Sequence, residues 1–317
     1  MFIKFFVVLI VSLFSTPLFA DTKGPAVPNY PLDKLAENIY VIHGPITTPN
    51  PQNQGFMNNP GIILTSKGVV IVDPGGTVQS GEMVLRVLKT ISNKPGVAVF
   101  NTHVHGDHWL ANQAIQARYP NAPIYAHPET IKKIPEGAGQ EWVQLMERST
   151  QGKSIGTRIV AANHPINNSD KITIGDTSLT IHHYGVSHTD TDIMIAVDTN
   201  KALFMGDNLF NGRLPRTAEG HIGRTIEACE KIIKINPSVI IPGHGKSGGK
   251  KMFYHSLDVL RILYTTVRQQ YELDLSDFEM KPVVVKALDK YKHWETFDSL
   301  VGKSISQAYL EIEQADF

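Results

Sequence analysis

The sequence predicts a layered α/β protein in which two sheets pack face to face and helices lie outside them. One observation is that apolar strand runs repeatedly lead into a Gly-bearing loop that holds a His or an Asp. Such loops carry Asp73, His103 to His108, His188, Asp207 and His244. The other is that strands and helices fall into two similar halves, each with hairpins, a helix and a last strand. Strand ends that carry polar residues in the same way are expected along one edge of a sheet structure, where a rigid scaffold presents chemistry.

Length and charge restrict the kind of ligand. The chain has 317 residues, with 30 basic and 30 acidic side chains, and its net charge is zero with His neutral. There is therefore no global field to attract nucleic acid, and a small-molecule substrate is expected instead. The hydrophobic content of 42% is that of a globular protein with a substantial core.

Residues 1–20 are interpreted as an export signal. They contain a lone Lys4, an apolar run from Phe5 to Phe14 and a small Ala20 before the polar Asp21. As a membrane anchor this stretch would be short, and no basic residue follows it directly. We therefore expect a periplasmic or secreted protein whose mature form has no stable membrane span. The single cysteine, Cys229, cannot form an internal disulfide, and its apolar helical neighbours predict a core position.

The N-terminal half is predicted as follows. A Pro-rich linker at 24–31 precedes strands at 38–43, 61–64, 69–72, 97–100 and 123–126, and helices at 77–92 and 109–119. His43 is expected at the surface, at the end of its strand. The loop at 45–60 is either a plain connection or a flap over a site, and its length favours the flap. The stretch at 129–163, with Trp142 and Met146 in a helical pattern, resembles an insertion that could wall a pocket.

The C-terminal half predicts two hairpins, then a helix and a strand, and finally a group of helices. The two hairpins are expected at 171–174 with 178–181 and at 193–197 with 202–205. A helix at 225–235 and a strand at 239–241 follow, and the last helices are expected at 253–273, 283–291 and 304–313. We therefore divide the chain into the signal, a layered domain at 21–250 and a C-terminal helical segment at 251–317.

The stretch Asn101 to His108 is predicted to bind metal. Three imidazoles and a carboxylate fall between His103 and His108, and Gly106 permits a tight turn among them. Alternation along an extended backbone sends His103 and His105 the same way, while Asp107 and His108 begin a helix and can face back. Ionisable groups gathered at a strand end cost stability unless something binds them.

The ordered motifs resemble those of a known family. His103-x-His105-x-Asp107-His108, His188 in Ser-His-Thr-Asp, Asp207 in Met-Gly-Asp, His244 in Pro-Gly-His-Gly, and Asp73 are together similar to the metallo-β-lactamase superfamily of metallohydrolases, over about residues 36–248. Gly206 to Phe210 is similar to glyoxalase II-like hydrolases, and the C-terminal helices look like those of exported relatives that accompany quinoprotein and sulfur-oxidation systems. The resemblance implies an αββα sandwich with a C-terminal helical appendage.

The resemblance also implies the site. His103, His105 and His188 would hold one Zn²⁺, and Asp107, His108 and His244 a second, with Asp207 bridging the two. Asp107 and Asp207 are the candidate catalytic residues. A hydroxide shared by the metals would cleave an ester, lactone, thioester or β-lactam bond of a small-molecule substrate. Asp73 is expected to accept a ring N–H from one of the ligand imidazoles.

Some features depart from this pattern. Lactamases with a Cys ligand place it where this chain has Asp207, and no Lys lies between Asn208 and Leu214 to hold a drug carboxylate. Arg213 could replace that Lys, but we expect it to be a surface residue. Flavodiiron reductases carry Glu at the position of His105, which disfavours that class. Two alternatives stay open: a mononuclear iron oxygenase of the persulfide dioxygenase kind, and a non-catalytic metal-stabilised binding module.

Overall fold

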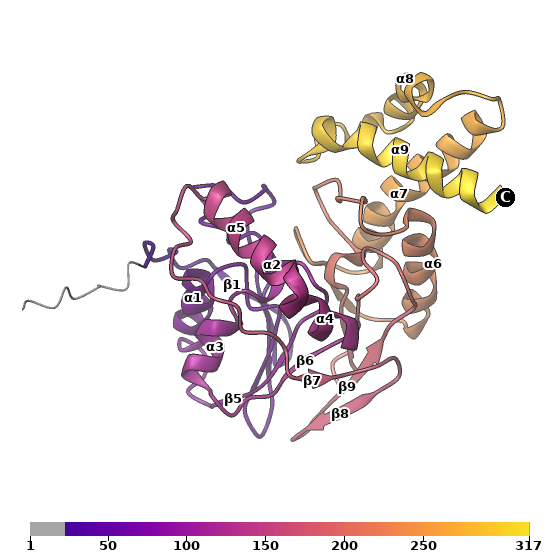
Figure 1. The fold of residues 1–317 in the computed structure, drawn as a ribbon. Coiled ribbons are helices and arrows are strands. Elements are labelled where there is room, and N and C mark those ends of the chain that lie inside the picture. Colours follow the sequence, from indigo (N-terminus) through magenta and orange to yellow (C-terminus); the bar gives the residue numbers. More distant parts are fainter. Residues whose placement is uncertain (1–22, 317) are drawn as a thin grey trace, which may run out of the picture.

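The computed structural model describes residues 23–316, and its two sheets pack against each other with helices on their outer faces (Figure 1). The predicted export signal lies outside the described residues. No helix in the described part of the chain is long and apolar enough to span a membrane. The predicted α/β sandwich with its C-terminal helices is confirmed.

The first sheet has seven strands in chain order. They are β1 (Leu32–Ala36), β2 (Ile39–Ile42), β3 (Gly61–Leu64), β4 (Val69–Val72), β5 (Gly96–Phe100), β6 (Ile124–Ala126) and β7 (His164–Pro165). Strands β1 to β4 pair antiparallel, and β4 to β7 pair parallel. Strand β1 was not predicted, because its side chains are only partly buried and it becomes a strand by pairing at the sheet edge with β2.

The second sheet has the order β12-β11-β10-β9-β8. These strands are β8 (Lys171–Ile174), β9 (Thr177–His182), β10 (Met194–Val197), β11 (Ala202–Phe204) and β12 (Val239–Ile241). Only β11 and β12 pair parallel in this sheet. All of them were predicted, because their apolar runs are bounded by turn residues.

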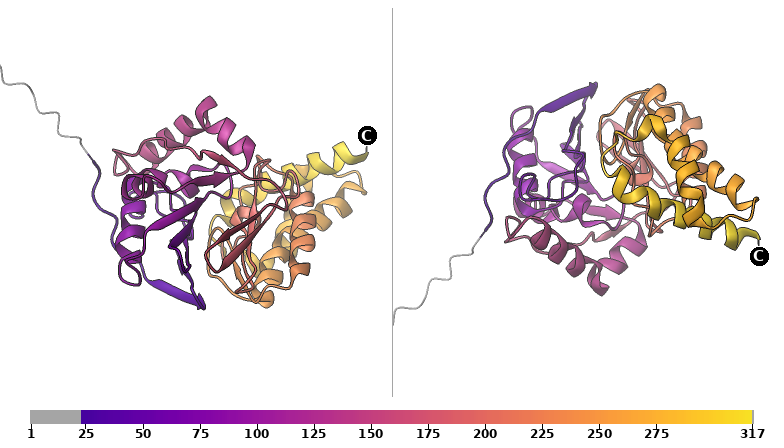
Figure 2. Two further views of the ribbon diagram at one scale, coloured as in Figure 1. Left: turned by 90° about the horizontal axis from the view of Figure 1, so that it is seen from below. Right: turned by 90° about the horizontal axis from the view of Figure 1, so that it is seen from above.

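Alternation along the strands separates the core into layers. Ile39 and Val41 of β2 face Leu179 and Ile181 of β9 in the core between the sheets. The opposite faces lie under helices. The helices over the first sheet are α1 (Val78–Leu88) and α3 (Asn112–Arg118), and those over the second are α6 (Ile222–Ile232) and α7 (Lys250–Tyr271). The views in Figure 2 show the same succession of layers from below and above.

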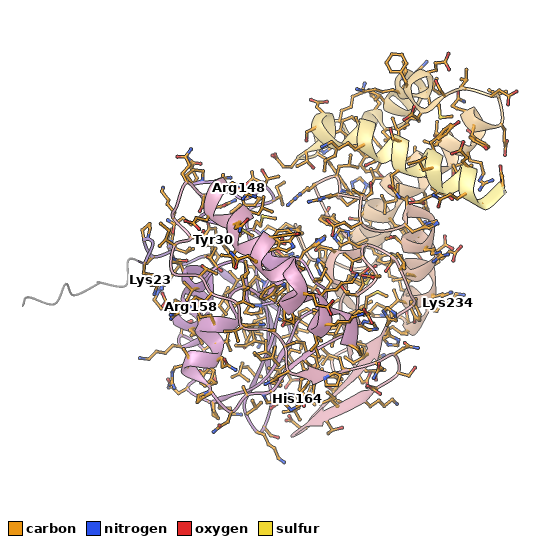
Figure 3. All side chains as sticks on the ribbon, in the orientation of Figure 1. Lys23, Tyr30, Arg148, Arg158, His164 and Lys234 are labelled. Carbon is orange, nitrogen blue, oxygen red and sulfur yellow. The ribbon has the colours of Figure 1, made fainter. Side chains whose placement is uncertain are left out.

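The predicted helix at 109–119 is broken in the structure. It consists of α2 (Gly106–Trp109) and α3, because the backbone N–H of Ala111 donates to the carbonyl of Gly75 at 2.9 Å, outside the helix. The insertion that follows contains α4 (Pro128–Lys133), the π-helical turn η1 (Ile134–Ala138) and α5 (Gly139–Ser149). Charged side chains of this region, such as those of Arg148 and Arg158, are exposed (Figure 3).

The C-terminal helices share one core with part of the sandwich. They are α7, α8 (Asp277–Ala287) and α9 (Phe297–Asp316), with the short 3-10 turn η4 (Asp289–Tyr291) between α8 and α9. Two further 3-10 turns, η2 (Gly206–Asn208) and η3 (Ile233–Ile235), lie in the sandwich. Helix α8 begins before the predicted 283, because Ser276 and Glu279 form a capping box. The first turns of α7 pack on the second sheet through Phe253, and its later turns pack on α8 and α9 through Leu263. The division at residue 250 stays a prediction.

Candidate metal centre

The predicted ligand residues lie together at one edge of the two sheets. Asp73 follows β4, His103 to His108 follow β5, His188 follows β9, Asp207 follows β11 and His244 follows β12. All of these side chains are buried, with His103 and His108 fully enclosed. The convergence of strand ends inferred from the sequence is therefore what the fold produces.

Two groups of candidate ligands are formed. The first cluster is His103, His105, His188 and Asp207, and the second cluster is Asp107, His108 and His244. Within each cluster one ligand atom per residue lies within 4.8 Å of all the others. In the first, Nδ1 of His105 lies 3.1 Å from Nε2 of His188. In the second, Nε2 of His244 lies 3.2 Å from Oδ2 of Asp107.

Asp207 lies between the clusters. Its Oδ2 is 3.5 Å from Nε2 of His188 in the first cluster and 3.4 Å from Nε2 of His244 in the second. Its Oδ1 is 3.1 Å from Nε2 of His108. A carboxylate in this place can contribute one oxygen to each of two metal ions.

The donor set fits zinc. Nε2 of His103 and Oδ1 of Asp207 are buried and have no hydrogen-bond partner of good geometry, although buried polar atoms are normally paired. A divalent cation between them would satisfy both atoms. Imidazole nitrogen with carboxylate oxygen is a donor set that zinc accepts.

Hydrogen bonds on the far side of the rings orient the imidazoles. Nδ1 of His108 lies 2.8 Å from Oδ2 of Asp73, and Nδ1 of His244 lies 2.9 Å from the carbonyl oxygen of Met57. Nε2 of His105 lies 3.0 Å from Oε2 of Glu219. Such partners fix the tautomer that presents the other nitrogen to a metal. The ring N–H bond expected of Asp73 is confirmed, with His108 as its partner.

Two of these partners were missed by sequence reasoning. Glu219 lies in a loop without a recognisable motif, far along the chain from His105. Met57 acts through its backbone carbonyl, which leaves no trace in the residue type. Neither has a sequence signal of its own, because proximity is decided by the packing of the loops.

Charges divide the metal-free centre into two parts. Burial lowers the pKa of His103 well below its ordinary value and that of His188 to about 3. Burial also opposes charge on His108, but the carboxylates around it outweigh this effect and hold its pKa well above the ordinary value. His244 has a raised pKa for the same reason, chiefly because of Asp207. Without metal, His108 and His244 therefore keep their protons to higher pH than His103 and His188 do.

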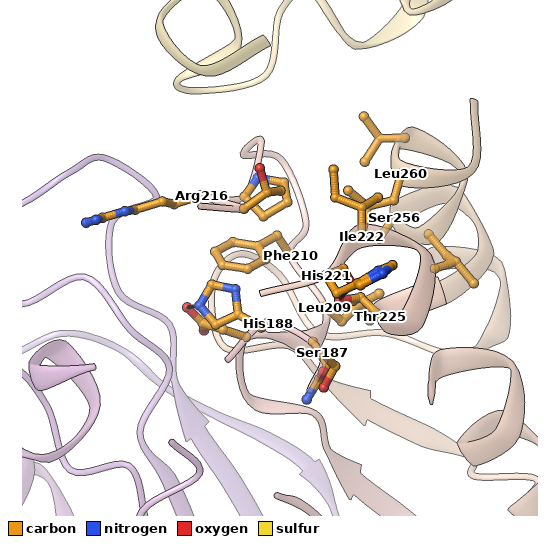
Figure 4. A pocket seen from close by; sticks show the side chains of 16 residues that line it. Ser187, His188, Leu209, Phe210, Arg216, His221, Ile222, Thr225, Ser256 and Leu260 are labelled. Atoms are coloured by element: carbon orange, nitrogen blue, oxygen red, sulfur yellow. Dashed lines mark hydrogen bonds and ion pairs between the residues drawn. The ribbon is translucent and has the colours of Figure 1, made fainter. Parts of the chain in front are cut away.

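A cavity of about 290 Å³ opens onto both clusters. Met57 of the 45–60 loop and Trp142 of α5 line it, together with Phe210 and Leu300. The insertion therefore walls a pocket, as its pattern suggested, and the 45–60 loop lines the same cavity, while its role as a flap stays a prediction. Beside it, between α6 and α7, lies a small chamber of about 20 Å³ whose lining includes only His188 and Asp207 of the clusters (Figure 4). This chamber has room for about one water molecule.

Two predictions about single residues are wrong. Arg213 is only 7% exposed and lines the 290 Å³ cavity, because its loop folds inward against the C-terminal segment. Its Nε and Nη1 atoms are buried without a hydrogen-bond partner. His43 was expected at the surface, but its side chain is 7% exposed and lies 2.8 Å from Asp33 and 2.9 Å from Ser247.

Sequence comparisons agree with this geometry. The profile of a family described as "Metallo-beta-lactamase superfamily" matches residues 53–244, which include both clusters. The chain is 23% identical over 235 residues to metallo-beta-lactamase type 2 of Bacillus sp. (strain 170), covering 73% of this chain and 82% of that protein. It is 28% identical over 162 residues to hydroxyacylglutathione hydrolase of Nostoc sp. (strain PCC 7120 / SAG 25.82 / UTEX 2576), covering 51% of this chain. That match spans 53% of the Nostoc protein, about half of its length.

Solved structures share the fold. A metallo-beta-lactamase from Pontibacter korlensis aligns with a TM-score of 0.59 at 18% identity, over 73% of this chain and 98% of that one. The sec-alkylsulfatase Pisa1 from Pseudomonas sp. aligns with a TM-score of 0.69 at 18% identity, over 88% of this chain and 50% of that one. At these identities the likeness concerns the fold alone.

Proposed function

The chain belongs to the metallo-β-lactamase superfamily of hydrolases, and from that premise we propose that it is a binuclear zinc hydrolase for an ester, lactone, thioester or β-lactam bond. The observation that carries the proposal is the position of Asp207 between two buried clusters of His and Asp. Two zinc ions held there would polarise the bond to be cleaved and activate a water molecule for attack.

The residues of the chain have distinct tasks in this proposal. The imidazoles of the first cluster would hold one metal and those of the second cluster the other, and Asp207 could contribute to both sites. Asp107 has a pKa of about 2, because the neighbouring imidazoles outweigh its burial, so it stays ionised throughout the working pH range. Trp142 and Met57 restrict water and leave an apolar surface for the substrate.

Arg213 supports a substrate that carries an anionic group. Its buried guanidinium lines the cavity and has two nitrogen atoms without a partner. Burial of an unpaired charge is costly, and a carboxylate, sulfate or phosphate group on the substrate would offset that cost through charge-assisted hydrogen bonds. We therefore propose a small substrate with an anionic group near the cleaved bond and an apolar remainder against Trp142 and Leu300.

The two alternative functions receive less support. A mononuclear iron oxygenase needs only one set of ligands, whereas Asp107, His108 and His244 form a second buried set. A binding module stabilised by metal would not need a cavity of about 290 Å³ opening onto the ligands. Export to the periplasm or medium stays part of the proposal, on the basis of residues 1–20.

Metal analysis and a substrate screen test the proposal. Protein purified from its native compartment should contain about two equivalents of zinc. The screen should compare esters, lactones, thioesters and β-lactams, each with and without a carboxylate, together with sulfate and phosphate esters. Activity should disappear after exhaustive chelation and return when zinc is added. Turnover that persists in metal-free protein would overturn the proposal, and one equivalent of iron with oxygen consumption would favour the oxygenase.

A further inference from the structure

One loop beside the metal centre is hydrogen-bonded to the C-terminal helical segment. This connecting loop, residues 212–221, leads from the strand-end segment after Asp207 to the start of α6. Near its beginning, the N–H of Leu214 donates to the carbonyl of Glu295 at 3.0 Å, and the hydroxyl of Thr296 donates to the carbonyl of Leu214 at 2.8 Å. The C-terminal segment therefore holds the first part of the loop by main-chain pairing.

The middle of the connecting loop contacts the first cluster through Glu219. Its Oε2 lies 3.0 Å from Nε2 of His105, and its Oε1 lies 3.0 Å from Nη2 of Arg216. Both carboxylate oxygens therefore have partners, and the one facing His105 is fixed. Because Nε2 of His105 is engaged in this way, its Nδ1 is the nitrogen presented to the other members of the cluster.

The end of the connecting loop is held by Glu311 of α9. This carboxylate is 4% exposed, accepts the N–H of Ile222 at 2.7 Å and of Gly223 at 3.2 Å, and lies 2.9 Å from Nδ1 of His221. It therefore caps the N-terminus of α6, where the backbone N–H groups lack partners within the helix. In this way Glu311 of α9 holds His221, the second residue after Glu219, and the first two residues of α6.

The connecting loop is also pressed against the segment that carries His188. The N–H of His221 donates to the carbonyl of Ser187 at 2.7 Å. A Cβ added to Gly220 would lie 2.1 Å from the carbonyl oxygen of Ser187 and 2.4 Å from that of His188. Figure 4 shows His188, Ser187 and His221 gathered around the small chamber on this side of the site. These close contacts leave the loop little room to move at Gly220 and His221.

We propose that Glu219 is a positioning residue that orients His105 for metal binding, and that Glu311 of α9 keeps Glu219 in place. The inference rests on the proposed function in one respect, since it takes the first cluster to be a metal site. Helix α9 would then support metal binding at the first cluster, although it contributes no ligand.

Zinc affinity measured without substrate tests the role of Glu219. Competition with a chromophoric chelator should give two zinc dissociation constants for the unmodified protein. Glu219→Ala should raise one of them by roughly 10-fold, the lower end of the usual range for such partners, because the side chain is 44% exposed and water can partly replace it. Glu219→Gln, which can still accept the ring N–H, should restore most of the affinity. The control is Glu227→Ala, an exposed glutamate of α6.

A double-mutant cycle tests the link to α9. Glu311→Ala should raise the same dissociation constant as Glu219→Ala does, whereas Glu313→Ala on the same helix should not. Because both residues act through one contact to His105, the double variant should bind zinc no more weakly than Glu219→Ala alone. If Glu311→Ala does not fold, Glu311→Gln serves in its place and should show a smaller effect in the same direction.

The outcomes separate this inference from the proposed function. A chain that binds no zinc at all would refute the binuclear site. A chain that binds two zinc ions, with affinities unchanged by Glu219→Ala, would refute only the positioning role. Effects of Glu219→Ala and Glu311→Ala that add in the double variant would show independent action and would refute the link through α9.

Discussion

The carboxylate of Asp73 lies 2.8 Å from Nδ1 of His108 in the second cluster. It is also linked to His103 in the first cluster, through the hydroxyl of Thr102. The hydroxyl of Thr102 donates to Oδ2 of Asp73 at 2.7 Å, and the same hydroxyl lies 3.0 Å from Nδ1 of His103. Because that hydroxyl proton is engaged by Asp73, the Thr102 oxygen accepts the ring N–H of His103. One carboxylate therefore orients one imidazole in each cluster.

Asp73→Asn should weaken zinc binding by roughly 10- to 100-fold. Oδ1 of Asp73 accepts the backbone N–H of Thr102, while Oδ2 faces the hydroxyl of Thr102 and Nδ1 of His108, and an amide has only one oxygen to accept these bonds. Chelator competition measures the affinity, and thermal melting of the metal-free protein serves as the control. Asp73 also occupies a left-handed turn, with φ of 50°, before Pro74. Unchanged zinc affinity with a lower melting temperature would mean that Asp73 serves only the turn.

Asp207→Ala should remove one metal or both and nearly abolish turnover, since this carboxylate faces ligands of both clusters. Elemental analysis of the purified variant gives the metal content, and turnover of the best substrate from the screen gives the activity. Asn208→Ala is the neighbouring control and should have a milder effect on both. Full metal content and activity in Asp207→Ala would contradict the binuclear assignment.

Zinc binding to the second cluster should release protons near neutral pH. The raised pKa values of His108 and His244 favour the charged form of each ring in the metal-free protein, and zinc requires both rings neutral. The affinity of this cluster should therefore rise with pH until the raised pKa values are passed. His188, with a pKa of about 3, contributes no such proton in the first cluster.

Calorimetric zinc titrations in buffers of different ionisation enthalpy measure these protons. His103→Ala, which leaves the second cluster intact, should release more protons per zinc than His244→Ala, which leaves the first. Equal proton release by the two variants would show that the charges are not divided between the clusters in this way.

Arg213→Met should lower kcat/KM for anionic substrates by roughly 10- to 100-fold, corresponding to the loss of one or two charge-assisted hydrogen bonds. A neutral ester of the same substrate is the control and should be hydrolysed about as well by both proteins. Thermal stability should not fall, because the buried guanidinium has two nitrogen atoms without partners and methionine fills a similar volume. Equal losses for the charged and neutral substrates would indicate a structural role instead.

The sequence by itself determined the two-sheet architecture through its local patterns. The seven candidate ligands came from ordered motifs that resemble those of the metallo-β-lactamase superfamily, and the fold brings these residues together. Apolar runs such as Val69 to Val72 form strands wherever turn residues bound them, and the run from His103 to His108 places its imidazoles by the alternation of an extended backbone followed by a helical turn. The expected bond from Asp73 to a ligand imidazole follows from the same placement, because adjacent parallel strands end side by side.

Only the tertiary structure decided which distant groups meet these ligands. Helix α2 ends where Ala111 bonds to Gly75 across the site. Arg213 is buried because its loop pairs with the C-terminal segment. Glu219 contacts His105 because Glu311 of α9 holds the end of the loop that carries Glu219. None of these contacts has a local signal, since each joins segments far apart in the chain whose proximity results from packing of the whole molecule.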